Sequence, residues 1–310
     1  MSKYVVFLFC LFSLATNAQK KVFLFSYFVG NGQDGLHLAY SNDGLKWTAL
    51  NHGKSYVLPT VGKDKLMRDP CILQGKDGQF HMVWTSGWWD HQIGYASSPD
   101  LIQWSEQKDI PVMAQEPTAK NSWAPELVYD PEAKNYIIFW ATTIPGRHSE
   151  VASSEREKGL NHRIYCTKTT DFNTFTPTEM FFNPDFSVID ATILPKDGKF
   201  YLFLKNENPN PPEKNIRVTV SDRASGPYPV KVSAPITGKY WAEGPTALQV
   251  GKYVYVYFDK YTSHQYGAVR SKNMKDWEDV SDLVSFPEGV RHGSAFRIDQ
   301  AILDKLLERN

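Results

Sequence analysis

The sequence predicts an all-β protein, a five-bladed β-propeller, and three observations support this fold class. A strand that runs into a polar turn occurs five times in the 310-residue chain. A second pattern, an acidic residue next to an opening strand, occurs four times. The patterns repeat with a period on the order of 50 to 60 residues, and each repeat holds about four strands, as a propeller blade does.

The opening strands are the first elements of each repeat. The acidic motifs beside them are Arg68-Asp69-Pro70, Trp123-Ala124-Pro125-Glu126, Val188-Ile189-Asp190-Ala191 and Trp241-Ala242-Glu243-Gly244-Pro245. The first strand of a propeller blade lines the central axis. We therefore expect the four carboxylates to occupy equivalent structural positions around one mouth of the central channel.

A second strand follows in each of these repeats and is more apolar than the first. These strands are predicted at residues 80–84, 136–140, 200–204 and 253–258. Three of them come after Asp77-Gly78, Asp197-Gly198 or Gly251, which are residues that tight hairpin turns require.

The third strand of each repeat ends in the polar turn. In each copy an alternating strand enters the turn, and in four copies an aromatic residue follows it. The five copies are residues 38–47, 93–104, 164–175, 216–222 and 267–277.

The two ends of the chain are predicted to complete one blade together. The first repeat lacks an acidic opening strand and begins with residues 22–28, whereas residues 291–298 form a strand without a blade of its own. Pairing these strands would close the ring and leave no exposed central edge. The only helix of consequence is expected at residues 299–307.

The composition favours a neutral ligand. Lys and Arg together number 34, as do Asp and Glu, so the formal net charge is zero. Such a chain has no electrostatic reason to bind nucleic acid or an anionic membrane. Aromatic residues make up 14% of the chain, which suits both a β-rich core and platforms that stack on sugars.

Residues 1–18 are typical of a secretory signal peptide. Lys3 precedes an apolar run over residues 4–15, and the small residues Thr16 and Ala18 precede Gln19. The run is shorter than the roughly 20 apolar residues that span a bilayer, so no membrane insertion is expected. The prediction is a signal peptide at residues 1–18, a single five-bladed propeller domain at residues 19–310, and a secreted or periplasmic location.

The cysteines are too few for a disulfide framework. Cys10 leaves with the signal peptide, and Cys71 and Cys166 show neither metal-ligand nor Cys-x-x-Cys spacing. We expect two buried free thiols, with a single disulfide between them as the alternative.

Carboxylates that share one mouth of a channel can divide the work of an acid and a base. Neighbouring negative charges raise one another's pKa, so protonated and ionised carboxyl groups can coexist near neutral pH. Glycoside hydrolysis needs this combination, and a gap of roughly 6.5 to 9.5 Å between the two groups admits a water and inverts the anomeric carbon.

The four acidic motifs, in this order on a five-unit repeat, resemble glycoside hydrolase family 43. The resemblance covers essentially the whole chain after residue 18. It implies a five-bladed propeller that removes arabinose, xylose or galactose residues with inversion. The chain departs from most of the family because about 50 residues precede Asp69 after the signal peptide, which places this residue in the second blade.

The resemblance also implies roles for single residues. Asp69 would be the general base, Glu243 the general acid, and Asp190 the residue that tunes the acidity of Glu243 and holds it in place. Arg291 would contact the modulating carboxylate or the sugar. His292 resembles an axial histidine of the family, which in some members contacts a calcium ion or a water cluster in the channel.

Other residues are candidates for substrate binding. Trp123 and Trp241 are expected in the pocket wall, with Arg68 beside them. Glu126 would contact the substrate or satisfy backbone groups at the start of its strand. Trp88-Trp89 would either stack on a sugar or cap the blade, and residues 144–161 form a loop over the mouth or a solvated insertion.

The sequence therefore predicts a secreted, inverting, exo-acting glycoside hydrolase. It would release a terminal pentose, with α-L-arabinofuranose as the first candidate, from an oligosaccharide or a plant-type polysaccharide. The alternatives are a β-D-xylosidase, an exo-galactanase or a propeller that binds carbohydrate without cleaving it. No cofactor is required for the chemistry, a structural calcium in the channel is the one candidate ion, and the oligomeric state is left open.

Overall fold

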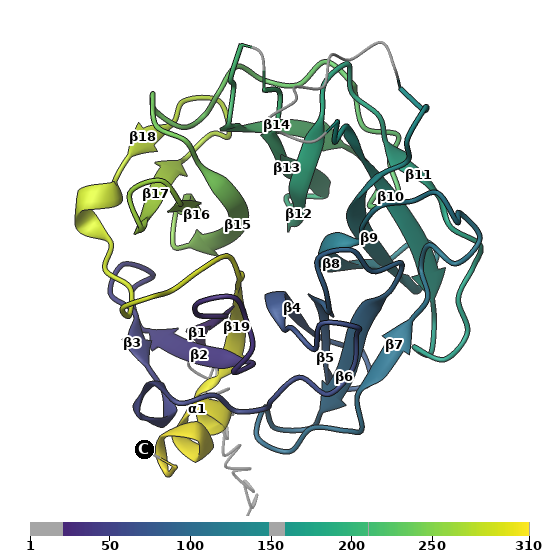
Figure 1. Cartoon of the computed structure of the whole chain (residues 1–310). Coiled ribbons are helices and arrows are strands. Elements are labelled where there is room, and N and C mark those ends of the chain that lie inside the picture. The colour runs from purple at the N-terminus through teal and green to yellow at the C-terminus, as the bar shows by residue number, and fades with distance from the viewer. Residues whose placement is uncertain (1–20, 149–158, 210, 310) are drawn as a thin grey trace, which may run out of the picture.

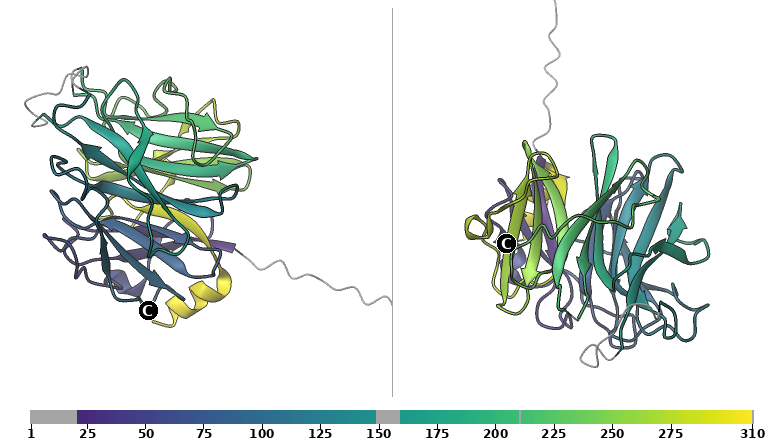
Figure 2. Two further views of the ribbon diagram at one scale, coloured as in Figure 1. Left: turned by 90° about the vertical axis from the view of Figure 1, so that its right-hand side faces the viewer. Right: turned by 90° about the horizontal axis from the view of Figure 1, so that it is seen from above.

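The computed structural model describes residues 21–148, 159–209 and 211–309, and it confirms the five-bladed β-propeller. Five antiparallel sheets stand around a central axis (Figure 1). In side view the sheets surround this axis, and the loops that join their strands gather at its two ends (Figure 2). The innermost strands contact one another in a closed cycle around the channel.

Four of the five blades contain four strands, and their order from the axis outward follows the chain except in the first blade. Blade one consists of β19 (Ser294–Asp299), β1 (Lys21–Tyr27), β2 (His37–Ser41) and β3 (Thr48–Ala49). Blade two consists of β4 (Arg68–Gln74), β5 (Phe80–Thr85), β6 (Ile93–Ser98) and β7 (Lys108–Ile110). Blade three consists of β8 (Trp123–Asp130), β9 (Asn135–Thr143), β10 (His162–Thr169) and β11 (Glu179–Phe182).

The remaining blades follow the same plan, with one strand fewer in the fourth. Blade four consists of β12 (Val188–Lys196), β13 (Lys199–Asn206) and β14 (Asn215–Ser221), so among the described residues it lacks the fourth strand that the repeat predicted. Blade five consists of β15 (Glu243–Val250), β16 (Tyr253–Lys260), β17 (Gln265–Ser271) and β18 (Glu278–Asp279). Within the residues that the structure describes, the helical elements are η1 (Asn51–Gly53), η3 (Ser281–Leu283) and α1 (Gln300–Leu307).

The ring closes between the two ends of the chain, as predicted. Strand β19 pairs antiparallel with β1, so that Val22 lies opposite Ile298 and Ser26 lies opposite Ser294. The Ser26 hydroxyl also donates to the carbonyl oxygen of Pro70 in blade two, at 2.6 Å. Helix α1 follows directly and buries Leu303 and Leu306 against the apolar cluster of blade one, and each such burial stabilises the fold by about 2 kcal/mol.

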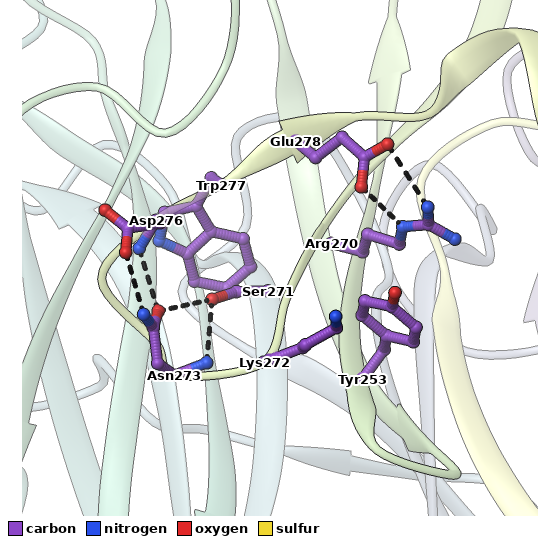
Figure 3. Close-up of a pocket in the computed structure, with 8 residues that line it drawn as sticks. All are labelled: Tyr253, Arg270, Ser271, Lys272, Asn273, Asp276, Trp277 and Glu278. Atoms are coloured by element: carbon purple, nitrogen blue, oxygen red, sulfur yellow. Dashed lines mark hydrogen bonds and ion pairs between the residues drawn. The ribbon is translucent and has the colours of Figure 1, made fainter.

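The polar turn at the end of the third strand has one recurring structure. In blade two the Asp100 carboxylate accepts hydrogen bonds from the backbone N–H groups of Ile102 and Gln103, at 2.9 and 2.8 Å. Asp43 and Asp171 accept equivalent bonds in blades one and three, and Asn273 does so in blade five (Figure 3). The repeated sequence pattern of a strand followed by a polar turn therefore encodes this turn structure.

Two of the remaining predictions concern the cysteines and the absence of a membrane-spanning segment. Cys71 and Cys166 are buried free thiols, as expected. Within the described ranges, none of the helices has the length and apolar character needed to cross a membrane. The predicted signal peptide and most of the predicted loop at residues 144–161 lie outside the described residues.

Candidate active site

A cavity of about 350 Å³ lies where the innermost strands of the blades begin. Its volume falls within the range of small-ligand pockets. Strands β4, β12 and β15, which carry three of the predicted acidic residues, surround the axis in Figure 1. The cavity is lined by Gly30, Asn31, Arg68, Asp69, Thr85, Trp88, Trp123, Ile189, Asp190, Lys205, Glu207, Glu243, Arg291 and His292.

A bulge at the start of each innermost strand decides which side chains reach the cavity. The pairing register shifts at the start of β4, β8, β12 and β15. The residue inside each bulge has a positive φ of 46 to 59°, a conformation that glycine adopts most readily. These residues are Asp69, Ala124, Asp190 and Gly244.

The prediction that all four carboxylates occupy equivalent positions is wrong. Only Asp69 and Asp190 stand inside their bulges, at the residue with positive φ. Glu243 stands one residue earlier in its motif, and Glu126 stands two residues later, where its strand is again paired. Because strand residues alternate between faces, one shared motif places its acidic groups in three different environments.

Asp69 is held as an ionised carboxylate. The Thr85 hydroxyl donates to its Oδ2 at 2.7 Å, and Nδ1 of His292 lies 3.3 Å from its Oδ1. Burial opposes the charged form, but His292, Arg68 and the Thr85 hydroxyl outweigh it and hold the pKa of Asp69 below its ordinary value. Thr85 is itself fixed, because its oxygen accepts a hydrogen bond from the backbone N–H of Ala124 at 2.8 Å.

Asp190 is tied to the strand that carries Glu243. Its Oδ2 accepts a hydrogen bond from the backbone N–H of Gly244 at 3.0 Å. Burial raises the pKa of Asp190 to about 6, although the positive charges of His292 and Lys205 act in the opposite direction. Only glycine fits at 244, since a Cβ there would lie 2.4 Å from Cγ of His292.

Glu243 lies between two cations. Nζ of Lys205 is 3.0 Å from its Oε2, and a guanidinium nitrogen of Arg291 is 3.4 Å from its Oε1. Arg291 makes a shorter contact of 2.6 Å with Asp259. Arg291 therefore contacts Glu243 and Asp259 instead of the modulating carboxylate Asp190. Because Arg291 also lines the cavity, its contact with the sugar stays a prediction.

Glu126 lies behind the cavity and is not among the residues that line it. Its Oε2 accepts hydrogen bonds from the Thr192 hydroxyl at 3.0 Å and from the Cys71 thiol at 3.4 Å. Burial raises the pKa of Glu126 to about 7. The Glu126 carboxyl group thus connects its own strand to β4 and β12 of the two neighbouring blades.

Aromatic side chains form one wall of the cavity around Arg68. The guanidinium lies 4.2 Å from the ring centroid of Trp88 and 4.6 Å from that of Phe28, and it donates to Oδ1 of Asn31 at 2.9 Å. Trp123 belongs to the same wall, and its indole N–H donates to the carbonyl oxygen of Trp88 at 2.7 Å.

Two other predicted tryptophans lie outside this wall. Trp241 lines a separate surface hollow, which also contains Tyr240 and residues of the loop before β14. Trp89 is 49% exposed and contacts Trp123 at a ring distance of 5.6 Å. Trp88 and Trp89 thus differ, because Trp88 supports Arg68 and Trp89 offers an open ring.

His292 is placed as a hydrogen-bonding cation. Burial disfavours its charged form, but Asp69, Asp190 and Glu126 outweigh this effect and raise the pKa of His292 to about 9. A protonated imidazole has no lone pair for a metal. Across the described part of the chain, no three His, Cys, Asp or Glu side chains are arranged to hold an ion. A protonated His292 would therefore not ligate an ion, and a structural calcium in the channel stays a prediction.

Sequence reasoning missed a second set of site residues. Thr85, Lys205 and Asp259 lie directly opposite Arg68, Ile189 and Glu243 in the pairing of the first two strands of their blades. Each contacts Asp69, Glu243 or Arg291. The signal was present, because each is the polar residue that ends the apolar second strand of its repeat.

The hollow drawn in Figure 3 is a feature of the repeat. It lies around the polar turn of blade five and includes Asn273 and the aromatic residue Trp277 that follows it. A second hollow of similar size surrounds the same turn in blade three, with Thr169 and Phe175. Neither hollow is lined by any of the four acidic residues Asp69, Glu126, Asp190 and Glu243.

The comparisons with known proteins agree with the geometry. Residues 19–304 match a protein family described as "Probable glycosyl hydrolase domain", which is related to glycoside hydrolase family 43. An α-L-arabinofuranosidase of Bifidobacterium longum subsp. longum is 24% identical over 185 residues. That match spans 54% of this chain and 17% of the relative, so this chain covers a small part of that protein.

Solved structures share the fold. The α-L-arabinofuranosidase of Lactobacillus brevis superposes with a TM-score of 0.53 at 16% identity, over 69% of this chain and 72% of that chain. An exo-β-1,3-galactanase of Phanerochaete chrysosporium superposes with a TM-score of 0.51 at 12% identity, over 69% of this chain and 49% of that chain. At these identities the likeness is one of fold.

Proposed function

The chain belongs to this glycosyl hydrolase family related to family 43, and we propose that it is an inverting glycoside hydrolase with Asp69 as general base and Glu243 as general acid. The observation that carries the proposal is the cavity itself. Asp69, Asp190 and Glu243 come from three different blades and line one space of about 350 Å³. A monosaccharide unit in this space would lie between the two reacting groups.

The base side of the mechanism follows from the contacts of Asp69. An ionised carboxylate with a lowered pKa accepts a proton from a water molecule as that water attacks the anomeric carbon. The Thr85 hydroxyl at 2.7 Å and His292 at 3.3 Å orient the group and keep it charged. No metal ion is needed to activate the water.

The acid side uses Glu243, which would protonate the glycosidic oxygen as the bond breaks. Asp190 would act as the modulator of this step. It binds the Gly244 backbone, so it fixes the segment that carries Glu243, and its own charge lies close enough to oppose a second negative charge on that residue.

The substrate class proposed is a terminal pentose, with α-L-arabinofuranose first. Support comes from the arabinofuranosidase among the relatives and from the motifs that resemble family 43. A galactose residue is the second candidate, since a galactanase and a β-1,3-galactosidase share the fold. We further propose that residues 1–18 direct export, so that the enzyme meets its polysaccharide outside the cytoplasm.

The test is monosaccharide release from arabinan, arabinoxylan and arabinogalactan, resolved by chromatography. Wild type should free one sugar, and Asp69→Asn and Glu243→Gln should each lose at least about a hundredfold in rate, as loss of a general base or acid does. Asp222→Asn and Glu278→Gln are matched controls, since both carboxylates are exposed partners of a Lys or Arg away from the cavity.

Other outcomes would redirect the proposal. Release of galactose instead of arabinose would replace the preferred sugar and keep the mechanism. Binding of a polysaccharide without turnover by wild type would contradict the enzyme and favour a carbohydrate-binding propeller.

A further inference from the structure

Lys205 is a buried cation beside the proposed general acid. Its side chain is 2% exposed, and it ends the apolar run of β13 directly opposite Ile189. Its ammonium group lies 3.0 Å from Oε2 of Glu243 and 2.7 Å from Oε2 of Glu207. A lysine is almost never buried to this degree without a paired partner, so its position depends on these carboxylates.

The contacts extend into a line of alternating charges. Glu207 also contacts Lys214, at 2.6 Å, and Arg291 connects the other side of Glu243 to Asp259. Burial of Lys205 opposes its charge, but Glu207 and Glu243 outweigh it and raise the pKa of Lys205 well above its ordinary value. Lys205 is therefore a permanent positive charge in the cavity wall.

Several other charged or titratable groups face Glu243 from the surrounding strands. Arg68, Asp190, Asp259, Tyr266 and Arg291 all interact electrostatically with it. Among the described residues, Lys205 and Arg291 are the cations that form ion pairs with its carboxylate. The two pairs use different oxygens, and the pair on Oε2 is shorter by 0.4 Å.

This asymmetry assigns different tasks to the two oxygens of Glu243. The oxygen that holds the ammonium at 3.0 Å keeps its lone pairs engaged. The other oxygen accepts a longer hydrogen bond of 3.4 Å from Arg291 and is the more weakly held of the two, so it is the one that can carry the proton. Glu207 shares the ammonium and supplies a second negative charge, which keeps Lys205 in place when Glu243 is neutral.

We propose that Lys205 is a positioning residue for general-acid catalysis, which holds Oε2 of Glu243 so that Oε1 delivers the proton to the leaving oxygen. This inference rests on the proposed function. Lys205 would act through Glu243 and would not contact the sugar.

The test compares leaving groups in wild type and the Lys205→Met variant. Two aryl glycosides of the released sugar are used, an unsubstituted phenyl glycoside, which needs protonation, and a dinitrophenyl glycoside, which does not. Lys205→Met should lose at least about a hundredfold in kcat/KM on the phenyl glycoside and less than about tenfold on the dinitrophenyl glycoside.

The pH profile supplies an independent readout. A positive charge beside the proposed acid is lost in Lys205→Met, so the alkaline limb of kcat/KM should move to higher pH in this variant. Lys205→Arg, which retains the charge, should keep the limb of wild type. Lys199→Met is the matched control, since this exposed lysine of the same strand pairs with Asp222.

Equal losses on both glycosides with an unmoved alkaline limb would overturn the positioning role and leave a structural one. If Lys205→Met does not fold, Lys205→Arg decides the matter: a shifted guanidinium should lower activity on the phenyl glycoside more than on the dinitrophenyl glycoside, and an equal effect on both would contradict the proposal. Absence of turnover by wild type on both glycosides would contradict the proposed function itself, and this inference with it.

Discussion

At the scale of single residues, neighbours set the protonation of the groups around the cavity. His292 and Thr85 keep Asp69 ionised, whereas burial raises the pKa of Asp190 to about 6. The pKa of His292 rises to about 9 because three carboxyl groups surround it. An inverting hydrolase requires an ionised carboxylate as its general base, and the neighbours of Asp69 provide that condition.

Glu126 predicts a pH dependence of folding stability. Burial raises its pKa to about 7 from 4.5, so the folded protein keeps a proton that the unfolded chain releases over this range. The resulting stabilisation is complete below pH 4.5 and is lost as the pH rises to 7. In wild type this loss lowers the free energy of unfolding by about 3 kcal/mol at most between pH 4.5 and 7. Urea unfolding of Glu126→Gln should lack this contribution to the pH dependence.

The control for this experiment is Glu278→Gln, because Glu278 is exposed and pairs with Arg270. This variant should keep the slope of wild type between pH 4.5 and 7. An unchanged slope in Glu126→Gln would show that other buried groups, Asp190 among them, carry the pH dependence.

Sequence reasoning identified the residues with distinctive motifs and missed their partners. Asp69, Asp190 and Glu243 stand in acidic motifs that repeat, and the structure brings all three to one cavity. Lys205 and Thr85 stand at the ends of apolar strands, where a single polar residue resembles an ordinary strand terminus. Their role depends on cross-strand pairing. This pairing becomes visible in the sequence only when the repeats are aligned with one another.

At the scale of elements, the bulge and the polar turn perform different tasks. The bulges direct side chains into or away from the cavity, so a shift of one residue within the motif separates Glu243 from Asp190. The polar turns only end the third strands. The sequence predicted the acidic motif and the polar turn as repeats, but bulge geometry cannot be derived from a motif whose acidic residue changes position.

The turn of blade two gives a stability prediction. Asp100→Ala removes the acceptor of two backbone N–H groups, at 2.9 and 2.8 Å, and should lower the free energy of unfolding by about 1 kcal/mol. Asp222→Ala is the control, since Asp222 in blade four pairs only with the exposed Lys199 and accepts no such backbone bonds among those described. Equal effects in chemical denaturation would contradict a structural role for the turn.

At the scale of the whole molecule, ring closure and site assembly are one event. Arg291 and His292 precede β19, which completes blade one by pairing with β1. The backbone N–H of Arg291 donates to the carbonyl oxygen of Phe28 at 3.0 Å, so the start of the chain positions the residues that reach Glu243 and Asp69. The sequence predicted this closure because a strand was missing at one end and unpaired at the other.

Proton NMR of the sugar that wild type first releases distinguishes inverting from retaining hydrolysis between Asp69 and Glu243. An aryl α-L-arabinofuranoside should give the β-anomer first, followed by slow mutarotation, because water attacks the face opposite the leaving group. Initial release of the α-anomer would show retention and would contradict the account.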